Sequence, residues 1–155
     1  MYKITGVLLA ALLVTASVKP VNMKQLQDAT LNKTNDTLYV VNFWATWCKP
    51  CVNEMPYFVK AQDGFGGKKV KVVFVSMNSV RELAAVQQFV SAKQIKEDVL
   101  LLNAGNPNNW IDTVDVSWSG AIPATVMYRN GKKVYFREGE FTQNELDSII
   151  QTKIN

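Results

Sequence analysis

The chain has 155 residues, two cysteines and no histidine, and 17 basic against 13 acidic residues give a net charge of +4. This composition excludes serine–histidine catalysis and any four-ligand zinc site built from Cys and His side chains of one chain. The basic residues are scattered without interleaved aromatic residues, so we predict no nucleic-acid partner. Because 48% of the residues are hydrophobic, a core for one domain is available.

The first 16 residues have the pattern of a signal peptide. Lys3 is the positive start, residues 4–14 are mostly apolar, and residues 14–16 form a small-residue cleavage site. The apolar run is shorter than the roughly 20 residues of a membrane span. We therefore predict cleavage after Ala16, export to the periplasm or another extracytoplasmic compartment, and one domain over residues 17–155. An uncleaved N-terminal membrane anchor is the alternative.

A short helix over residues 23–31, capped by Asn22, is the first element predicted. Residues 38–44 follow as an apolar run rich in β-branched and aromatic residues, which predicts a strand buried on both faces. A second helix begins at about Cys48, because Pro50 fits only the first turn of a helix. It is expected to run to about residue 62 with a bend at Pro56, before a glycine-rich loop at residues 63–67.

The second half of the chain alternates strands and helices. Predicted strands cover residues 70–77, 99–102, 126–129 and 133–138, and predicted helices cover residues 80–92 and 110–114. Asn130-Gly131 is a strong hairpin signal between the last two strands. A capping box at residues 142–145 opens a final helix with Leu146, Ile149 and Ile150 on one face.

Cys48-Lys49-Pro50-Cys51 is the motif that carries chemistry. A thiol at a helix N-terminus loses its proton easily, since unpaired N–H groups and the helix dipole favour an anion there, and Lys49 adds positive charge. Cys51 lies one turn further on, close enough to form a small disulfide ring. We therefore predict that Cys48 is the nucleophile and that Cys51, the more buried cysteine, resolves the mixed disulfide.

Residues 43–51, Phe-Trp-Ala-Thr-Trp-Cys-Lys-Pro-Cys, followed by Glu54-Met55-Pro56, resemble the thioredoxin superfamily and in particular its TlpA/ResA-type extracytoplasmic thiol–disulfide oxidoreductases. The resemblance covers about residues 23–153. It implies an α/β thioredoxin fold, with a central mixed β-sheet flanked by helices and the CxxC motif at a helix N-terminus. Members of this group usually carry an extra N-terminal strand pair, whereas only the short helix is predicted here.

The resemblance also assigns roles around the cysteines. Thioredoxins often keep a buried aspartate beneath the disulfide, but Asn42 stands at that position and cannot accept a proton. Glu54 follows Cys51 by three residues on the same helix face, and we predict that it accepts the proton of Cys51.

Substrate binding is predicted on both sides of the disulfide. Ile122-Pro123 matches the cis-proline of the family, which implies that Pro123 packs against the disulfide and that the backbone of Ile122 pairs with an extended substrate segment. We place Trp47, Lys49 and Pro50 on the other side, with Trp47 as a partly exposed contact platform.

The predicted function is an exported, monomeric reductant of protein disulfides that uses no cofactor or metal beyond its own cysteine pair. A membrane thiol reductant would return the pair to its dithiol form. A disulfide oxidase or isomerase with the same site is one alternative, and a thioredoxin-fold binding module with a structural disulfide is another. A peroxiredoxin is disfavoured because the usual Thr/Ser-x-x-Cys context is missing.

Overall fold

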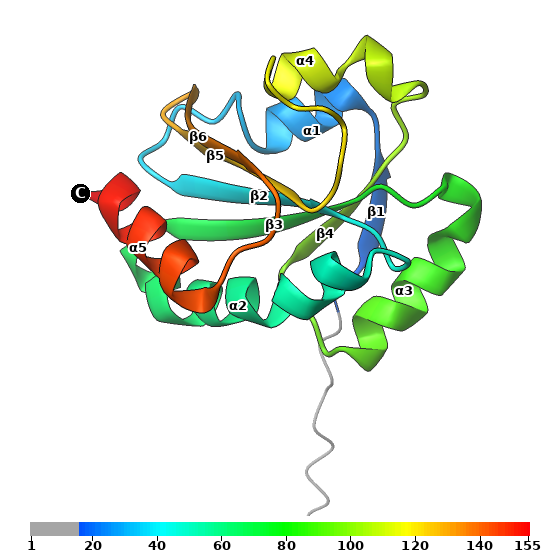
Figure 1. Ribbon diagram of the computed structural model, residues 1–155, viewed down its shortest axis with the longest axis horizontal. Helices are drawn as coiled ribbons and strands as arrows, with labels where there is room; N and C mark the ends of the chain where they lie inside the picture. The colour runs from blue at the N-terminus through cyan, green and yellow to red at the C-terminus, as the bar shows by residue number, and fades with distance from the viewer. Residues whose placement is uncertain (1–15) are drawn as a thin grey trace, which may run out of the picture.

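A six-stranded mixed sheet with the order β1-β4-β3-β2-β5-β6 forms the centre of the protein (Figure 1). The computed structural model describes residues 16–155. The strands are β1 (Val18–Val21), β2 (Leu38–Trp44), β3 (Val70–Ser76), β4 (Asp98–Leu102), β5 (Ala124–Arg129) and β6 (Lys132–Glu138). β1, β4, β3 and β2 are parallel, while β5 is antiparallel to β2 and to β6. The predicted mixed sheet is confirmed.

Helices cover both faces of this sheet. They are α1 (Met23–Ala29), α2 (Lys49–Phe65), α3 (Leu83–Ala92), α4 (Ile111–Val114) and α5 (Gln143–Ile154). α2, α3 and α5 lie on one face, and α1 and α4 lie on the other (Figure 1). Side chains of β2 therefore enter two cores in alternation, with Val40 and Trp44 on the α2 side and Val41 and Phe43 on the α1 side. Burial of β2 on both faces is as predicted.

Strand β1 corrects the prediction that only a helix precedes β2. A proline within four residues, Val-Lys-Pro-Val, argues against a strand in the middle of a sheet. β1 lies at the edge, however, where it pairs with β4 alone, and an edge strand tolerates the missing N–H. Gln87 of α3 fixes its start, since its side chain accepts from the Val18 N–H at 2.8 Å and donates to the Ala16 carbonyl at 2.9 Å. Apart from Ala16, the predicted signal peptide lies outside the described residues.

Helix α2 is longer than predicted, and the prediction of a loop at residues 63–67 is wrong. The helix continues past Pro56 to Phe65 and is followed by a 3-10 turn over Gly66–Lys68. A glycine inside a helix costs only about 1 kcal/mol relative to alanine. Packing of the half-buried Phe65 against the main core offsets a cost of that size.

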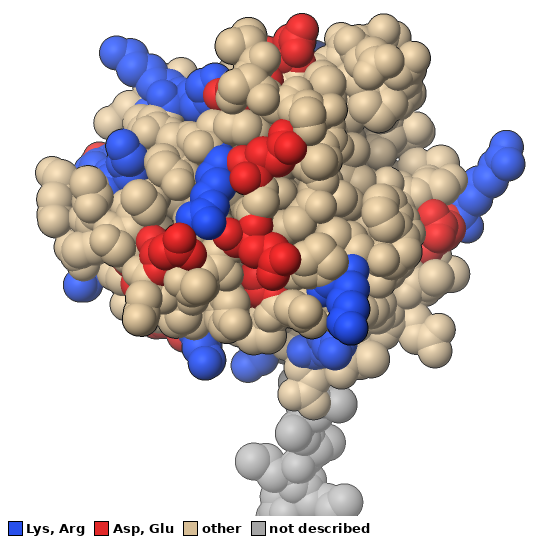
Figure 2. Space-filling model, viewed as in Figure 1, with Lys and Arg blue, Asp and Glu red and all other residues tan. Residues whose placement is uncertain are grey.

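Figure 2 shows basic and acidic side chains interspersed on much of the visible face, next to areas without charged side chains. Such a mixture leaves no continuous basic stripe on that face of the kind that binds a nucleic-acid backbone. Over residues 16–155, no helix has both the length and the apolar character needed to cross a bilayer.

Candidate active site

Cys48 and Cys51 form a disulfide at the start of α2. Cys48 is the N-cap residue, and its Sγ accepts a hydrogen bond from the N–H of Cys51 at 3.3 Å. Free N–H groups of a first helical turn stabilise a negative charge on such a sulfur, which favours the thiolate when the pair is reduced. Cys48 is 5% exposed and Cys51 is fully buried, so the predicted order of burial is confirmed.

The loop between β2 and α2 places the motif at the carboxyl edge of the sheet. Trp44, the last residue of β2, is buried against Phe89 of α3. The N–H of Cys48 then turns back to the carbonyl of Ala45 at 3.1 Å, and Pro50 occupies the first turn of the helix as predicted. Trp47 projects outward with 66% of its surface exposed, beside the nucleophile. Lys49 is exposed as well.

The loop before β5 closes over the other side of the disulfide. The Ile122–Pro123 peptide bond is cis, as the family resemblance implies. The carbonyl oxygen of Ile122 lies 3.7 Å from Cys48 Sγ, and Pro123 is buried. The Pro123 carbonyl accepts from the N–H of Gly139, at 2.8 Å, so the chain after β6 supports this loop.

Glu54 is a buried carboxylate one turn after Cys51, with 1% of its surface exposed. One oxygen accepts from Nδ2 of Asn42 at 2.9 Å, and the other accepts from the N–H of Phe141 at 2.7 Å. Burial raises its pKa to about 7, although the hydrogen bonds from Phe141 and Asn42 act to lower it. A carboxyl group with this pKa exchanges its proton near neutral pH.

The network around Glu54 includes two groups that the sequence analysis missed. Nδ2 of Asn42 also reaches Oγ1 of Thr125 in β5, at 3.2 Å, and both side chains are fully buried. Thr125 could have been found as a polar residue in an otherwise apolar strand, two positions after Pro123. The N–H of Phe141 could not have been found from the sequence, because the pattern of side chains does not show which backbone groups donate.

The spacing of Glu54 and Cys51 suits proton exchange without a permanent contact. Residues three apart on a helix are surface neighbours, with Cβ atoms about 5–6 Å apart. Within residues 16–155, Glu54 makes no hydrogen bond to either sulfur and no ion pair. The same residues contain no group of three His, Cys, Asp or Glu side chains placed to hold a metal ion.

Residues 14–137 match the AhpC/TSA family. The chain belongs to this family. Its relatives include a thiol-disulfide oxidoreductase ResA of Bacillus cereus, which is 30% identical over 112 residues, 72% of this chain and 60% of that protein. ResA of Bacillus subtilis is 30% identical over 111 residues, 71% of this chain and 58% of that protein. The predicted resemblance is confirmed, although this chain spans only about 60% of these relatives.

Solved structures of similar fold agree with the architecture. A thiol:disulfide interchange protein of the thioredoxin family from Chlorobium tepidum TLS superposes with a TM-score of 0.65 at 21% identity, covering 79% of this chain and 83% of that one. StoA from Bacillus subtilis superposes with a TM-score of 0.57 at 22% identity, covering 74% and 82%. At these identities the likeness establishes the thioredoxin-like fold.

Proposed function

We propose that this AhpC/TSA-family protein catalyses thiol–disulfide exchange with protein substrates and acts as an exported reductant. The observation that carries the proposal is the Cys48–Cys51 pair at a helix N-terminus, with a buried Glu54 of pKa about 7 in the next turn. An inert structural disulfide has no need of a buried carboxylate that titrates near neutral pH. The names of the relatives point to the same chemistry.

In the first step, the thiolate of Cys48 attacks one sulfur of the substrate disulfide. The substrate S–S bond breaks, a mixed disulfide forms on Cys48, and the second substrate sulfur leaves as a thiolate that takes up a proton. The buried Cys51 is shielded from the substrate at this stage. The helix N-terminus lowers the free energy of the attacking thiolate, since the N–H of Cys51 donates to the Cys48 sulfur and the helix dipole favours a negative charge there.

In the second step, Cys51 attacks the Cys48 sulfur and releases the substrate as a dithiol. Cys51 must lose its proton, and Glu54 is the acceptor that lies within one helical turn. The Cys48–Cys51 bond re-forms, so two electrons and two protons pass from the enzyme to the substrate. A small displacement of α2, or one bridging water, would complete the path from Cys51 to Glu54.

The substrate segment would lie in extended form along the loop that contains Ile122. The Ile122 backbone borders Cys48 and can pair with such a segment by strand addition. Trp47, Lys49 and Pro50 border the nucleophile on its other side.

The proposal also includes export of the chain and re-reduction of its cysteine pair. The signal-like residues 1–16 would direct the chain out of the cytoplasm, leaving a monomeric domain over residues 17–155. A membrane thiol reductant would then restore the dithiol, because an oxidising compartment supplies no soluble reductant. The protein would need no cofactor beyond its cysteine pair.

Reduction of insulin by dithiothreitol tests the proposal. The wild type should accelerate precipitation of the insulin B chain, and Cys48→Ser should abolish the acceleration. A wild type with no effect would instead support a binding module with a structural disulfide. A reduction potential near or below about −250 mV fits a reductant, whereas about −120 to −180 mV would assign the protein to the oxidases or isomerases.

A further inference from the structure

The turn that carries the nucleophile is held by a side chain from another part of the sheet. The chain turns between Ala45 and Cys48, where the N–H of Cys48 donates to the carbonyl of Ala45 at 3.1 Å. Between these two residues lie Thr46, which is half-buried, and Trp47, which is exposed. The side chain of Asn78, which follows β3, bonds to this turn at Thr46.

Asn78 uses both ends of its amide group on Thr46. Its Oδ1 accepts from the N–H of Thr46 at 3.0 Å, and its Nδ2 donates to Oγ1 of Thr46 at 2.8 Å. Asn78 is 2% exposed, so little water competes for these bonds. Because an amide group has an acceptor and a donor side by side, one asparagine fixes both the backbone and the side chain of Thr46.

Asn78 is in turn held by the end of β3. The hydroxyl of the fully buried Ser76 donates to Oδ1 of Asn78 at 3.0 Å and accepts from the N–H of Asn78 at 3.2 Å. The N–H of Met77 donates to the carbonyl of Trp44 at 2.7 Å, which joins the same segment to the end of β2. A continuous set of hydrogen bonds therefore connects the sheet to Thr46, two residues before the nucleophile.

The reactivity of Cys48 depends on the position that this turn gives it. Cys48 is the N-cap of α2, with φ −87° and ψ 95°, and in this conformation its Sγ accepts from the N–H of Cys51 at 3.3 Å. A sulfur at a helix N-terminus is stabilised as a thiolate only while it stays close to the free N–H groups of the first turn. A turn without its contacts at Thr46 would hold the sulfur there less well.

We propose that Asn78 is a positioning residue for the exchange reaction, because its hold on Thr46 keeps the Cys48 sulfur at the N-terminus of α2. The inference rests on the proposed exchange activity and adds to it a residue that does not touch the reacting atoms. Loss of the Asn78 amide should therefore reduce the fraction of Cys48 that is present as thiolate.

The ionisable side chains around Cys48 stay in place when Asn78 is changed. Besides the second cysteine, α2 contributes Lys49 next to Cys48 and Glu54 in its second turn. The segments that border Cys48 from β3 and from β5, residues 76–79 and 119–123, contain no ionisable side chain. A shift in the titration of Cys48 would therefore report its position and not the loss of a neighbouring charge.

Alkylation of Cys48 by iodoacetamide across about pH 4 to 10 tests the proposal, because only the thiolate reacts. The parent protein for this series is Cys51→Ser. Asn78→Ala should move the midpoint of the alkylation rate up by about 1 pH unit, which is a roughly 10-fold smaller thiolate fraction below the midpoint. Thr46→Ala removes only the Oγ1 acceptor and should move the midpoint by about half as much.

Ser79→Ala is the matched control, one residue away from Asn78. Ser79 caps the next turn by accepting from the N–H of Arg81 at 3.3 Å, and within the described part of the chain its side chain makes no bond to residues 45–48. Loss of such a cap costs about 1 kcal/mol of stability. Because this variant keeps the contacts at Thr46, its alkylation midpoint should equal that of the parent.

Two further variants separate positioning from a general loss of stability. If Asn78 acts through Thr46, the double variant Asn78→Ala/Thr46→Ala should have the midpoint of Asn78→Ala, and Thr46→Ser, which keeps both contacts, should have that of the parent. A parent midpoint in Asn78→Ala or in Thr46→Ala, or shifts that add in the double variant, would overturn the positioning role alone. A wild type that does not accelerate insulin reduction would overturn the proposed function, whatever the alkylation midpoints are.

Discussion

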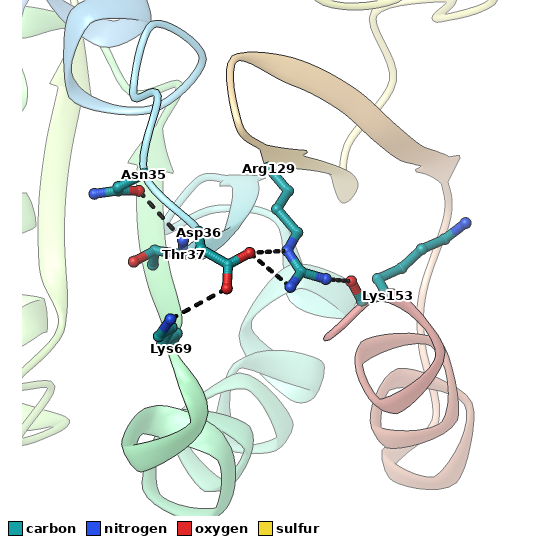
Figure 3. Close-up of polar contacts among 6 residues, drawn as sticks. All are labelled: Asn35, Asp36, Thr37, Lys69, Arg129 and Lys153. Atoms are coloured by element: carbon teal, nitrogen blue, oxygen red, sulfur yellow. Dashed lines mark hydrogen bonds and ion pairs between the residues drawn. The ribbon is translucent and has the colours of Figure 1, made fainter. Parts of the chain in front are cut away.

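Two carboxylates near opposite ends of β2 lie in different environments, one exposed between cations and the other buried among neutral groups. Asp36, two residues before the strand, is exposed and lies between two cations (Figure 3): one oxygen is 2.7 Å from Nη2 of Arg129, and the other is 3.2 Å from Nζ of Lys69. Hydrogen bonds from Arg129 and Lys69 lower its pKa. Glu54 is buried, has two neutral donors and makes no ion pair among the described residues, and burial raises its pKa to about 7.

The difference separates a carboxylate that is held in its ionised form from one that can titrate near neutral pH. Arg129 also donates to the carbonyl of Lys153 at 2.7 Å, so the cluster in Figure 3 ties the turn before β2 to the end of α5. Asp36 stays ionised throughout the neutral range and has no proton to exchange there. Glu54 can change its protonation state at neutral pH because burial raises its pKa into that range and no ion pair among residues 16–155 offsets the shift.

The largest expected effect is on stability as a function of pH. In the folded protein Glu54 keeps its proton up to about pH 7, whereas in the unfolded chain it has its ordinary pKa of 4.5. The folded state then binds more protons between these values, so the free energy of unfolding falls as the pH rises from 4.5 to 7, by about 3 kcal/mol. Urea unfolding of the oxidised protein should show this decline, and Glu54→Gln should remove most of it.

Asp36→Asn is the matched control for that experiment. The pKa of Asp36 in the folded protein is lowered from its ordinary value of 3.8. The stability that Asp36 contributes is therefore fully present above pH 3.8, and it is lost only as the pH falls through the pKa of the folded state. The variant should therefore follow the wild-type decline between pH 4.5 and 7. A Glu54→Gln variant with that same decline would show that another group causes it.

The second effect is on the rate at which Cys51 resolves a mixed disulfide. A glutamine at position 54 cannot accept a proton, and loss of a general base costs about 100-fold. Rapid mixing of the reduced protein with a chromogenic disulfide across pH 5 to 9 would measure the rate. Asp36→Asn should leave the pH profile unchanged. A wild-type profile in Glu54→Gln would exclude this residue as the acceptor.

A smaller effect is expected when the Asn42 donor is removed. Asn42→Leu deletes a hydrogen bond that favours the ionised form of Glu54, so the pKa of Glu54 should rise further. The midpoint of the resolution rate should move up by about 1 pH unit. A midpoint that moves down, or does not move, would mean that Asn42 does not control the charge of Glu54.

The elements with strong local patterns were predictable from the sequence. The apolar run of β2, the Asn-Gly hairpin and the Thr142 capping box each follow from short-range rules, and each is present. β1 was not predictable in this way, because Pro20 is acceptable only when the strand lies at an edge. The end of α2 also depended on a tertiary contact, the packing of Phe65.

Some groups of the candidate site were also predictable from local sequence, and others were not. Cys48, Cys51 and Glu54 are close in sequence, so a motif and a helical period place them together. Thr125 and the Phe141 N–H reach the site over separations of 83 and 87 residues, and only the folded sheet brings them there. The roles predicted for Trp47, Lys49, Pro50, Ile122 and Pro123 in substrate binding stay predictions.

Capture of the reaction intermediate tests the central claim most directly. Reduced Cys51→Ser would be mixed with a peptide disulfide and the products analysed by mass spectrometry after proteolysis. The account predicts a stable mixed disulfide on Cys48, because the buried resolving thiol has been removed. Failure to trap the peptide on Cys48, together with trapping on Cys51 in the Cys48→Ser variant, would contradict it.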